Sequence, residues 1–204
     1  MVTPAPSSPP VRIGITGTHS TGKTLLLKRI EMELRSHGMT VARTGRLAKR
    51  AAALGLPKMH HHTATSTEWI ICQGIADTLA AETQCADVVL VDRAPIDALA
   101  YYGAALEYRN ERAEPLEHER LRLLAATQHP TFTLLLATVL DPDIPASATD
   151  GHPYDPRYRT LADAHVHTLL AEDHLDHVRV TSDPAGVDAA IAQAVSLCLE
   201  AIAP

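Results

Sequence analysis

The sequence predicts an α/β fold in which helices cover both faces of a five-stranded parallel sheet. Short apolar runs alternate with longer segments of helical pattern along the chain, an order of elements typical of such folds. The run 87–92 contains four consecutive apolar residues, as expected for a strand that is buried on both faces. A phosphate-binding motif directly follows the run 11–16, and this motif requires a strand before it and a helix after it.

Five runs are predicted to be strands, and they cover residues 11–16, 40–44, 87–92, 131–137 and 178–181. Helices are predicted between them, over residues 25–38, 45–54, 66–85, 97–106, 157–172 and 187–202. The charged segment 107–122 is expected to form a solvated helical surface. Residues 1–10 are rich in proline and are expected to form a flexible leader. Residues 11–204 are expected to form a single domain, because a chain of 204 residues favours one.

The motif at residues 17–24 matches the pattern G-x-x-x-x-G-K-[ST] at every fixed position. Its glycines allow the backbone to wrap a phosphate, so that loop N–H groups and the following helix N-terminus bind the anion. Lys23 would reach the β- and γ-phosphates, and the Thr24 hydroxyl would bind Mg²⁺. The sequence therefore predicts a site for ATP and Mg²⁺ formed by Gly17, Thr18, His19, Ser20, Thr21, Gly22, Lys23 and Thr24.

An acidic residue, Asp92, ends the third predicted strand. Because the carboxyl ends of parallel strands meet at one edge of a sheet, Asp92 and the phosphate loop are expected to share a crevice. Asp92 would hold Mg²⁺, directly or through water, or would take the proton from an attacking hydroxyl; the sequence leaves both roles open. Arg93 would bind the acceptor or its phosphate with a two-pronged contact.

The segment 141–159 is predicted to be a lid over the nucleotide. Its first part, 141–156, is rich in proline and glycine, and a loop of this length is typically functional or mobile. Closure would bring Arg157 and Arg159 onto the charge that develops on the transferred phosphoryl group. Four further side chains either line an acceptor pocket or pack in the core, namely Trp69, Gln73, Tyr101 and Tyr102.

The composition narrows the classes of partner and compartment. The formal charge is −6 and the chain has no long basic stripe, which argues against nucleic acid as the main partner. No apolar run approaches the length of a membrane span, and the N-terminus lacks a signal pattern. Three widely spaced cysteines favour a reducing compartment, so a cytoplasmic protein is expected. The adjacent residues His60–His62 are not expected to bind a metal, because recognisable sites use spaced ligands, and their role stays open.

The motifs together resemble those of small P-loop kinases, in particular AAA_28-type ATPases. These ATPases are similar to the nicotinamide-riboside kinase domain of bifunctional regulators of NAD biosynthesis, and more distantly to deoxynucleoside and thymidylate kinases. The resemblance rests on residues 17–24, on the strand that ends in Asp92-Arg93, and on a loop-plus-arginine element near 150–159. Residues 92–101 are similar to the second-strand motif of this group, and residues 143–145 and 150–151 resemble its lid entrance.

This resemblance implies a P-loop NTPase three-layer sandwich with strand order 2-3-1-4-5. It also implies ATP-dependent phosphorylation of a small hydroxylated metabolite, with a nucleoside or nucleotide-like acceptor favoured. The group often carries an acidic residue at the end of its second strand, whereas residues 41–46 here contain none. The base role therefore shifts toward Asp92 or Asp97. The same departure leaves room for an acceptor phosphate or carboxylate, which Arg43 or Arg46 would hold.

Two other functions are compatible with the motifs. A regulatory P-loop NTPase would act as a switch whose bound nucleotide orders loops for a partner protein. A phosphate-binding protein without turnover would share the same loop. ATP consumption that depends on a small acceptor separates the kinase from both alternatives. The sequence leaves the acceptor and the oligomeric state open, with a homodimer among the alternatives.

Overall fold

Five strands form one parallel sheet in the computed structural model of the chain, which describes residues 9–144 and 155–202. The strands are β1 (Val11–Thr16), β2 (Val41–Thr44), β3 (Val88–Asp92), β4 (Leu134–Thr138) and β5 (Val178–Val180). Their order across the sheet is β2-β3-β1-β4-β5, and every neighbouring pair is parallel. The predicted order 2-3-1-4-5 is confirmed, and β1 lies at the centre of the sheet.

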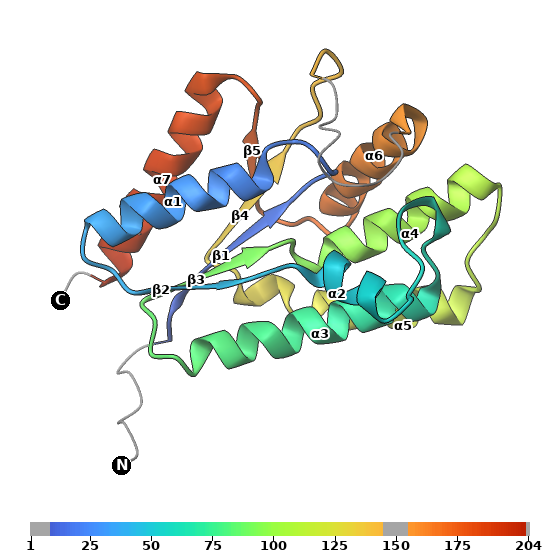
Figure 1. Cartoon of the computed structure of the whole chain (residues 1–204), viewed down its shortest axis with the longest axis horizontal. Helices are drawn as coiled ribbons and strands as arrows, with labels where there is room; N and C mark the ends of the chain where they lie inside the picture. The colour runs from blue at the N-terminus through green and yellow to red at the C-terminus, as the bar shows by residue number, and fades with distance from the viewer. Residues whose placement is uncertain (1–8, 145–154, 203–204) are drawn as a thin grey trace.

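Helices cover both faces of this sheet (Figure 1). They are α1 (Lys23–Ser36), α2 (Leu47–Ala53), α3 (Ala64–Glu82), α4 (Pro95–Arg109), α5 (Pro115–Ala126), α6 (Pro156–Glu172) and α7 (Pro184–Ile202), with the short 3-10 helices η1 (Met59–His61) and η2 (His129–Thr131). Helices α1 and α7 pack together on one face, whereas α3, α4, α5 and α6 lie on the other. The three-layer α/β sandwich that the resemblance implied is therefore confirmed.

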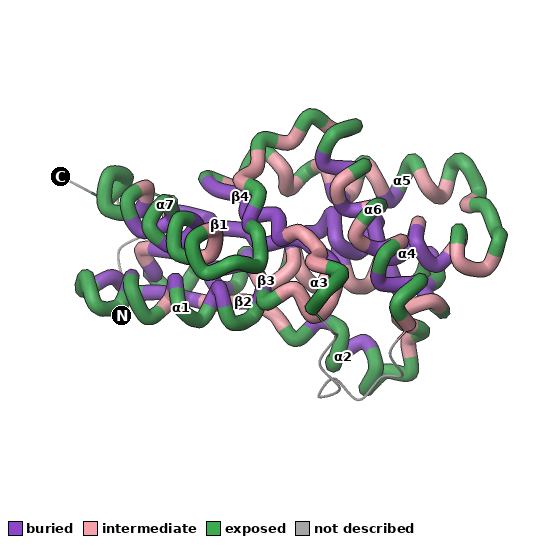
Figure 2. Tube along the Cα trace, turned by 90° about the horizontal axis from the view of Figure 1, so that it is seen from above, coloured by how far each residue is buried: buried purple, intermediate pink, exposed green. Residues whose placement is uncertain are grey.

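All six residues of the central strand β1 are buried, because both faces of the sheet are covered. Val11, Ile13 and Ile15 belong to the apolar core that α1 and α7 close. On the opposite face Gly14 leaves room for Phe132, whose ring carbon would lie 2.6 Å from a Cβ at that position. Figure 2 shows that burial is concentrated along the central strands. A strand in this position has two apolar environments, which explains its apolar sequence.

Helices α3 and α4 each begin two residues before their predicted starts, and local capping explains both differences. The Thr63 side chain accepts the backbone N–H of Ser66 at 3.2 Å, and the Ser66 hydroxyl accepts the N–H of Thr63 at 3.0 Å. This capping box starts α3 at Ala64 rather than at the predicted residue 66. Helix α4 begins at Pro95, since a proline needs no hydrogen-bond acceptor in the first turn.

The charged segment 107–122 is divided between two helices. Helix α4 continues to Arg109 and ends at Asn110, which has a φ of 55°. Helix α5 begins after Glu114, whose carboxylate caps its first turn by accepting the N–H of Glu117 at 2.7 Å. The fourth strand begins three residues later than predicted, at Leu134, because the preceding residues form η2.

Parts of two predicted segments lie outside the described residues. These are residues 1–8 of the predicted leader and residues 145–154 of the predicted lid. Among the described residues, α7 is one helix that is long and apolar enough to cross a membrane by length and composition alone. One stripe of α7, which includes Ile191, Val195 and Cys198, is buried against α1 and the sheet, and 22% of the apolar window is buried in all.

Candidate active site

The phosphate loop links β1 to α1 at the carboxyl end of the sheet. Gly17 has a φ of 136° and Gly22 has a φ of 82°, values that favour glycine. A Cβ on Gly17 would lie 2.1 Å from Oγ1 of Thr138 at the end of β4, so a side chain does not fit there. Gly22 directly precedes the first turn of α1, and the loop therefore leads into the unpaired N–H groups of that helix. This is the backbone geometry that anion binding requires.

Lys23 begins α1 and is buried beneath the phosphate loop. Its ammonium group donates to the backbone carbonyl of Thr18 and to the Thr21 hydroxyl at 3.3 Å. Burial and, secondarily, the Arg93 guanidinium lower the pKa of Lys23 to about 7, although nearby carboxylates, first that of Asp97, act in the opposite direction. A lysine in this environment gains most from a bound anion, which would restore its charge.

Arg159 of α6 holds the backbone of the phosphate loop. It is buried, and its Nε and Nη2 donate to the carbonyls of His19 at 3.2 Å and Ser20 at 2.9 Å. Its Nη1 donates to the carbonyl of Ile144 at 2.9 Å, and its own carbonyl accepts the Thr18 hydroxyl at 3.2 Å. Arg159 was expected to contact the transferred phosphoryl group, but here each of these guanidinium nitrogens donates to a backbone carbonyl. Arg159 thus connects the described start of the predicted lid to the loop.

Asp92 and Arg93 lie at the end of β3, at the same edge of the sheet as the phosphate loop, but of the two only Arg93 lines the cavity described below. The Asp92 carboxylate accepts a hydrogen bond from Arg43 at 3.1 Å. The Arg93 guanidinium donates to the Tyr101 hydroxyl at 3.2 Å and lies 5.2 Å from the centroid of that ring. Its Nη1 is also 3.7 Å from Oδ2 of Asp97.

Asp97, in the first turn of α4, connects this helix to the phosphate loop. Its Oδ1 accepts the backbone N–H of Gly17 at 2.9 Å and the hydroxyl of Thr16. Its Oδ2 has no hydrogen-bond partner among the described residues. Burial raises the pKa of Asp97, while the charges of Arg93 and Lys23 act against this shift. The sequence indicated Asp97 only as an alternative base; the available signal was an acid in the helix that directly follows Asp92-Arg93.

Aromatic rings close the crevice beside the loop. The Tyr101 hydroxyl lies 3.3 Å from Nδ1 of His19, and the Tyr158 hydroxyl donates to the Tyr101 carbonyl at 3.0 Å. The His62 ring lies 6.0 Å from the Tyr101 ring. Burial, followed by the charges of Arg93 and Arg109, lowers the pKa of His62 to about 4, so this ring is neutral near pH 7. The sequence analysis left the role of His62 open and did not single out Tyr158, because the placement of both rings depends on packing between distant segments.

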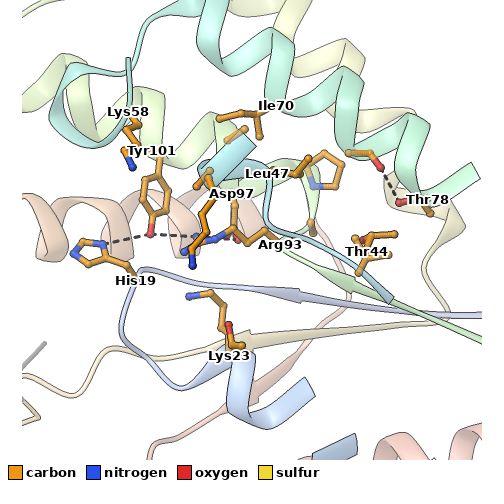
Figure 3. Close-up of a pocket in the computed structure, with 18 of the residues that line it drawn as sticks. His19, Lys23, Thr44, Leu47, Lys58, Ile70, Thr78, Arg93, Asp97 and Tyr101 are labelled. Carbon is orange, nitrogen blue, oxygen red and sulfur yellow. Dashed lines mark hydrogen bonds and ion pairs between the residues drawn. The ribbon is translucent and has the colours of Figure 1, made fainter. Parts of the chain in front are cut away.

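Lys23, His62, Arg93, Asp97 and Tyr101 line one cavity of about 870 Å³, which is near the upper end of the range for ligand pockets. Figure 3 shows Lys23 on one side of it and Arg93, Asp97 and Tyr101 on the other. The loop and α1 contribute His19, Ser20, Gly22, Lys23 and Thr24, and the segment around η1 contributes Lys58, Met59 and His62. Asp92, Arg157 and Arg159 are not among the described residues that line it.

Residues 12–185 match the family model described as AAA domain (AAA_28). The chain belongs to the AAA_28 family. No curated protein matches the sequence. Among solved structures, a crystal structure of NadR protein in complex with NR is similar, with a TM-score of 0.62 and 17% sequence identity. The similarity covers 89% of this chain and 50% of the NadR chain, so the chain spans about half the length of that protein. At this identity the similarity shows the shared fold alone.

In this AAA_28 protein, several residues that the sequence indicated have partners outside the cavity. The Arg157 guanidinium lies 4.8 Å from the ring centroid of Tyr108. Of the four side chains considered for an acceptor pocket, Tyr101 lines the cavity, whereas Trp69, Gln73 and Tyr102 are not among its lining residues. Arg43 pairs with Asp92, and Arg46 is exposed immediately before α2.

The three adjacent histidines have different environments. His62 is buried and lines the cavity, as described above. The His60 ring lies 4.0 Å from the His61 ring and 5.1 Å from the Tyr108 ring, measured between centroids. Among residues 9–144 and 155–202, no group of three or more His, Cys, Asp or Glu side chains is placed to hold a metal ion.

Proposed function

We propose that this chain is a kinase that transfers the γ-phosphoryl group of ATP to a hydroxyl of a small metabolite. The observation that carries the proposal is the position of Asp97 on the same cavity as the phosphate loop, with one carboxylate oxygen that has no hydrogen-bond partner among the described residues. Nucleosides and nucleotide-like compounds are the first acceptors to test, because the resemblance implies them and because NadR has been solved with NR bound. The cytoplasm, where ATP is available, is the proposed compartment.

On the nucleotide side, Lys23 would exchange the Thr18 carbonyl for the β- and γ-phosphates, and loop N–H groups would hold the phosphate oxygens. Two hard oxygen ligands would be available to Mg²⁺ there: the Thr24 hydroxyl, which lines the cavity, and the Asp92 carboxylate at the end of β3, which would exchange Arg43 for the ion. Bound Mg²⁺ would neutralise charge on the phosphates. Two protein ligands suffice, because Mg²⁺ usually keeps waters and takes the remaining oxygens from the substrate phosphates.

On the acceptor side, Asp97 would take the proton of the attacking hydroxyl. The acceptor oxygen forms a bond to the γ-phosphorus, the bond from that phosphorus to the bridging oxygen of ADP breaks, and the proton passes to Oδ2 of Asp97. The raised pKa of Asp97 suits this role, because a stronger base accepts the proton more readily. Asp92 is assigned to the metal rather than to the acceptor, because Asp97 lines the cavity and Asp92 does not.

Arg93 would stabilise negative charge that develops during the transfer. Its guanidinium is fixed between the Tyr101 hydroxyl and the Asp97 carboxylate, so it needs little reorganisation when the acceptor arrives. Arg157 and Arg159 are proposed to act through the lid. Arg159 would position the loop through the carbonyls of His19 and Ser20.

An ATP-consumption screen tests this function. The acceptors are nucleosides, nucleotides, related sugars and hydroxylated apolar compounds, and product masses identify phosphorylation. ATP consumption should be slow without an acceptor and rise with the correct acceptor.

Asp97→Asn should lower kcat by at least ~10²-fold, as for loss of a general base, with little change in affinity for an ATP analogue. The matched control is Asp77→Asn, which removes a carboxylate that pairs with Arg50 outside the cavity and should leave kcat unchanged. ATP consumption that responds only to a macromolecule would contradict the kinase assignment and indicate a regulatory switch.

A further inference from the structure

The cavity continues past the proposed transfer site into a part that we call the deep part. Helices α2 and α3, strand β3 and helix α4 supply its wall, through Leu47, Ile70, Gly74, Ile75, Val91 and Ala98. Figure 3 shows Leu47 and Ile70 on the side away from His19, with Thr44 and Thr78 farther along the same side. The cavity thus has a charged end, with Lys23, Arg93 and Asp97, and an apolar end under α3.

The polar groups that reach the deep part are mostly paired already. The Thr78 hydroxyl donates to the Gly74 carbonyl at 2.8 Å. The Arg12 guanidinium, which also lines the cavity, pairs with Glu82 and donates to the Gln128 amide oxygen at 3.4 Å. Thr44 contributes a hydroxyl where β2 ends. A polar body buried here would find few partners, and unpaired buried polar groups are costly.

We propose that the acceptor carries an apolar body, aliphatic or alicyclic, that fills the deep part while its hydroxyl lies at Asp97. This inference rests on the proposed function, since the transfer site fixes which end of the ligand is polar. The charged end orients such a ligand, because only its hydroxyl can use the hydrogen-bonding capacity of Oδ2 of Asp97. Burial of the apolar body supplies the affinity. A plain nucleoside, with a polar base and sugar, fits this wall less well.

Binding of a series of linear primary alcohols tests the proposal without ATP. The probes are 1-hexanol, 1-octanol and 1-decanol, with ribose as the polar comparator, and ligand-observed NMR measures Kd. Each pair of added methylenes that enters the deep part should lower Kd about fifteenfold, the factor expected for apolar burial. Ribose should bind more weakly than every alcohol. Equal Kd values across the three alcohols would overturn the proposal.

Gly74→Met is the filling variant and Gly74→Ala is its matched control. A Cβ at position 74 would lie 3.2 Å from Cδ1 of Leu47, the flexible end of a side chain, so both variants should fold. Both also replace a helix-interior glycine, which favours α3. Gly74→Met should weaken 1-decanol binding at least tenfold, whereas Gly74→Ala should change it less than threefold; neither should alter affinity for an ATP analogue. Unchanged 1-decanol binding in a folded Gly74→Met protein would overturn the proposal.

The same alcohols, offered with ATP, separate this inference from the proposed function. Suppose that alcohol binding depends on chain length but that neither these alcohols nor any compound of the acceptor screen yields a phosphorylated product. This result would contradict the kinase assignment and still support an apolar ligand. Phosphorylation of a nucleoside, together with equal binding of all three alcohols, would support the kinase and overturn the apolar acceptor.

Discussion

Nucleotide binding should change the protonation state of Lys23. Burial lowers the pKa of Lys23 to about 7 in the free protein, so at pH 8 about nine Lys23 side chains in ten are neutral. A triphosphate beside the ammonium group favours its charged form. Binding of a non-hydrolysable ATP analogue at pH 8 should therefore take up about 0.9 proton per site at Lys23, and at pH 6 only about 0.1. Because Lys23 must take up a proton when the nucleotide binds, nucleotide affinity should weaken above pH 7 by up to about tenfold per pH unit.

Calorimetry in buffers of different ionisation enthalpy measures this proton uptake. The observed binding enthalpy varies linearly with the ionisation enthalpy of the buffer, and the slope is the number of protons exchanged. Lys23→Arg is the matched control, because its guanidinium stays charged at every pH used and still contacts phosphate. Subtracting the slope of Lys23→Arg from that of the wild-type protein cancels the protons that the nucleotide itself exchanges. Equal slopes for both proteins at pH 8 would refute the reasoning, since Lys23 would then be charged before the nucleotide binds.

Three further predictions concern the loop, the cavity wall and the metal. Gly17→Ala should lower the free energy of unfolding in urea by about 1–3 kcal/mol more than Gly55→Ala, because both glycines have positive φ but only a Cβ at position 17 overlaps Thr138. Equal losses would contradict this overlap. Between pH 6.5 and pH 4, the free energy of unfolding of the wild-type protein should fall by about 3 kcal/mol more than that of His62→Gln. The unfolded chain binds a proton at His62 in this range, whereas the buried ring of the folded protein stays neutral down to its pKa of about 4. Parallel stability profiles would show that His62 titrates normally. Asp92→Asn should lower kcat at least ~10²-fold through weakened Mg²⁺ binding, a loss as large as that of a general base, and excess Mg²⁺ should restore the activity. A loss that Mg²⁺ does not rescue would return Asp92 to the base role.

The sequence by itself determined the elements whose signals are local. The bounds of the first strand, 11–16, were predicted as the structure has them, because apolar periodicity reports burial of consecutive residues. The phosphate loop was also predictable from the sequence, because backbone angles within the loop favour glycine at Gly17 and Gly22. The start of α3 was missed although its cap is also local, because Thr63, Ser66 and Thr67 all suit that role in sequence.

Only the tertiary structure decided which side chains meet. Asp92 and Asp97 are equally acidic in the sequence, but α4 turns Asp97 onto the cavity and leaves Asp92 with Arg43. Arg159 looked like a phosphate ligand, yet it binds carbonyls of a loop that lies 139 or more residues away in the sequence. The apolar deep part is likewise built from α2, α3, β3 and α4. Backbone patterns depend on neighbours a few residues apart, whereas these contacts depend on how distant elements pack, and one sequence carries no direct signal of that packing.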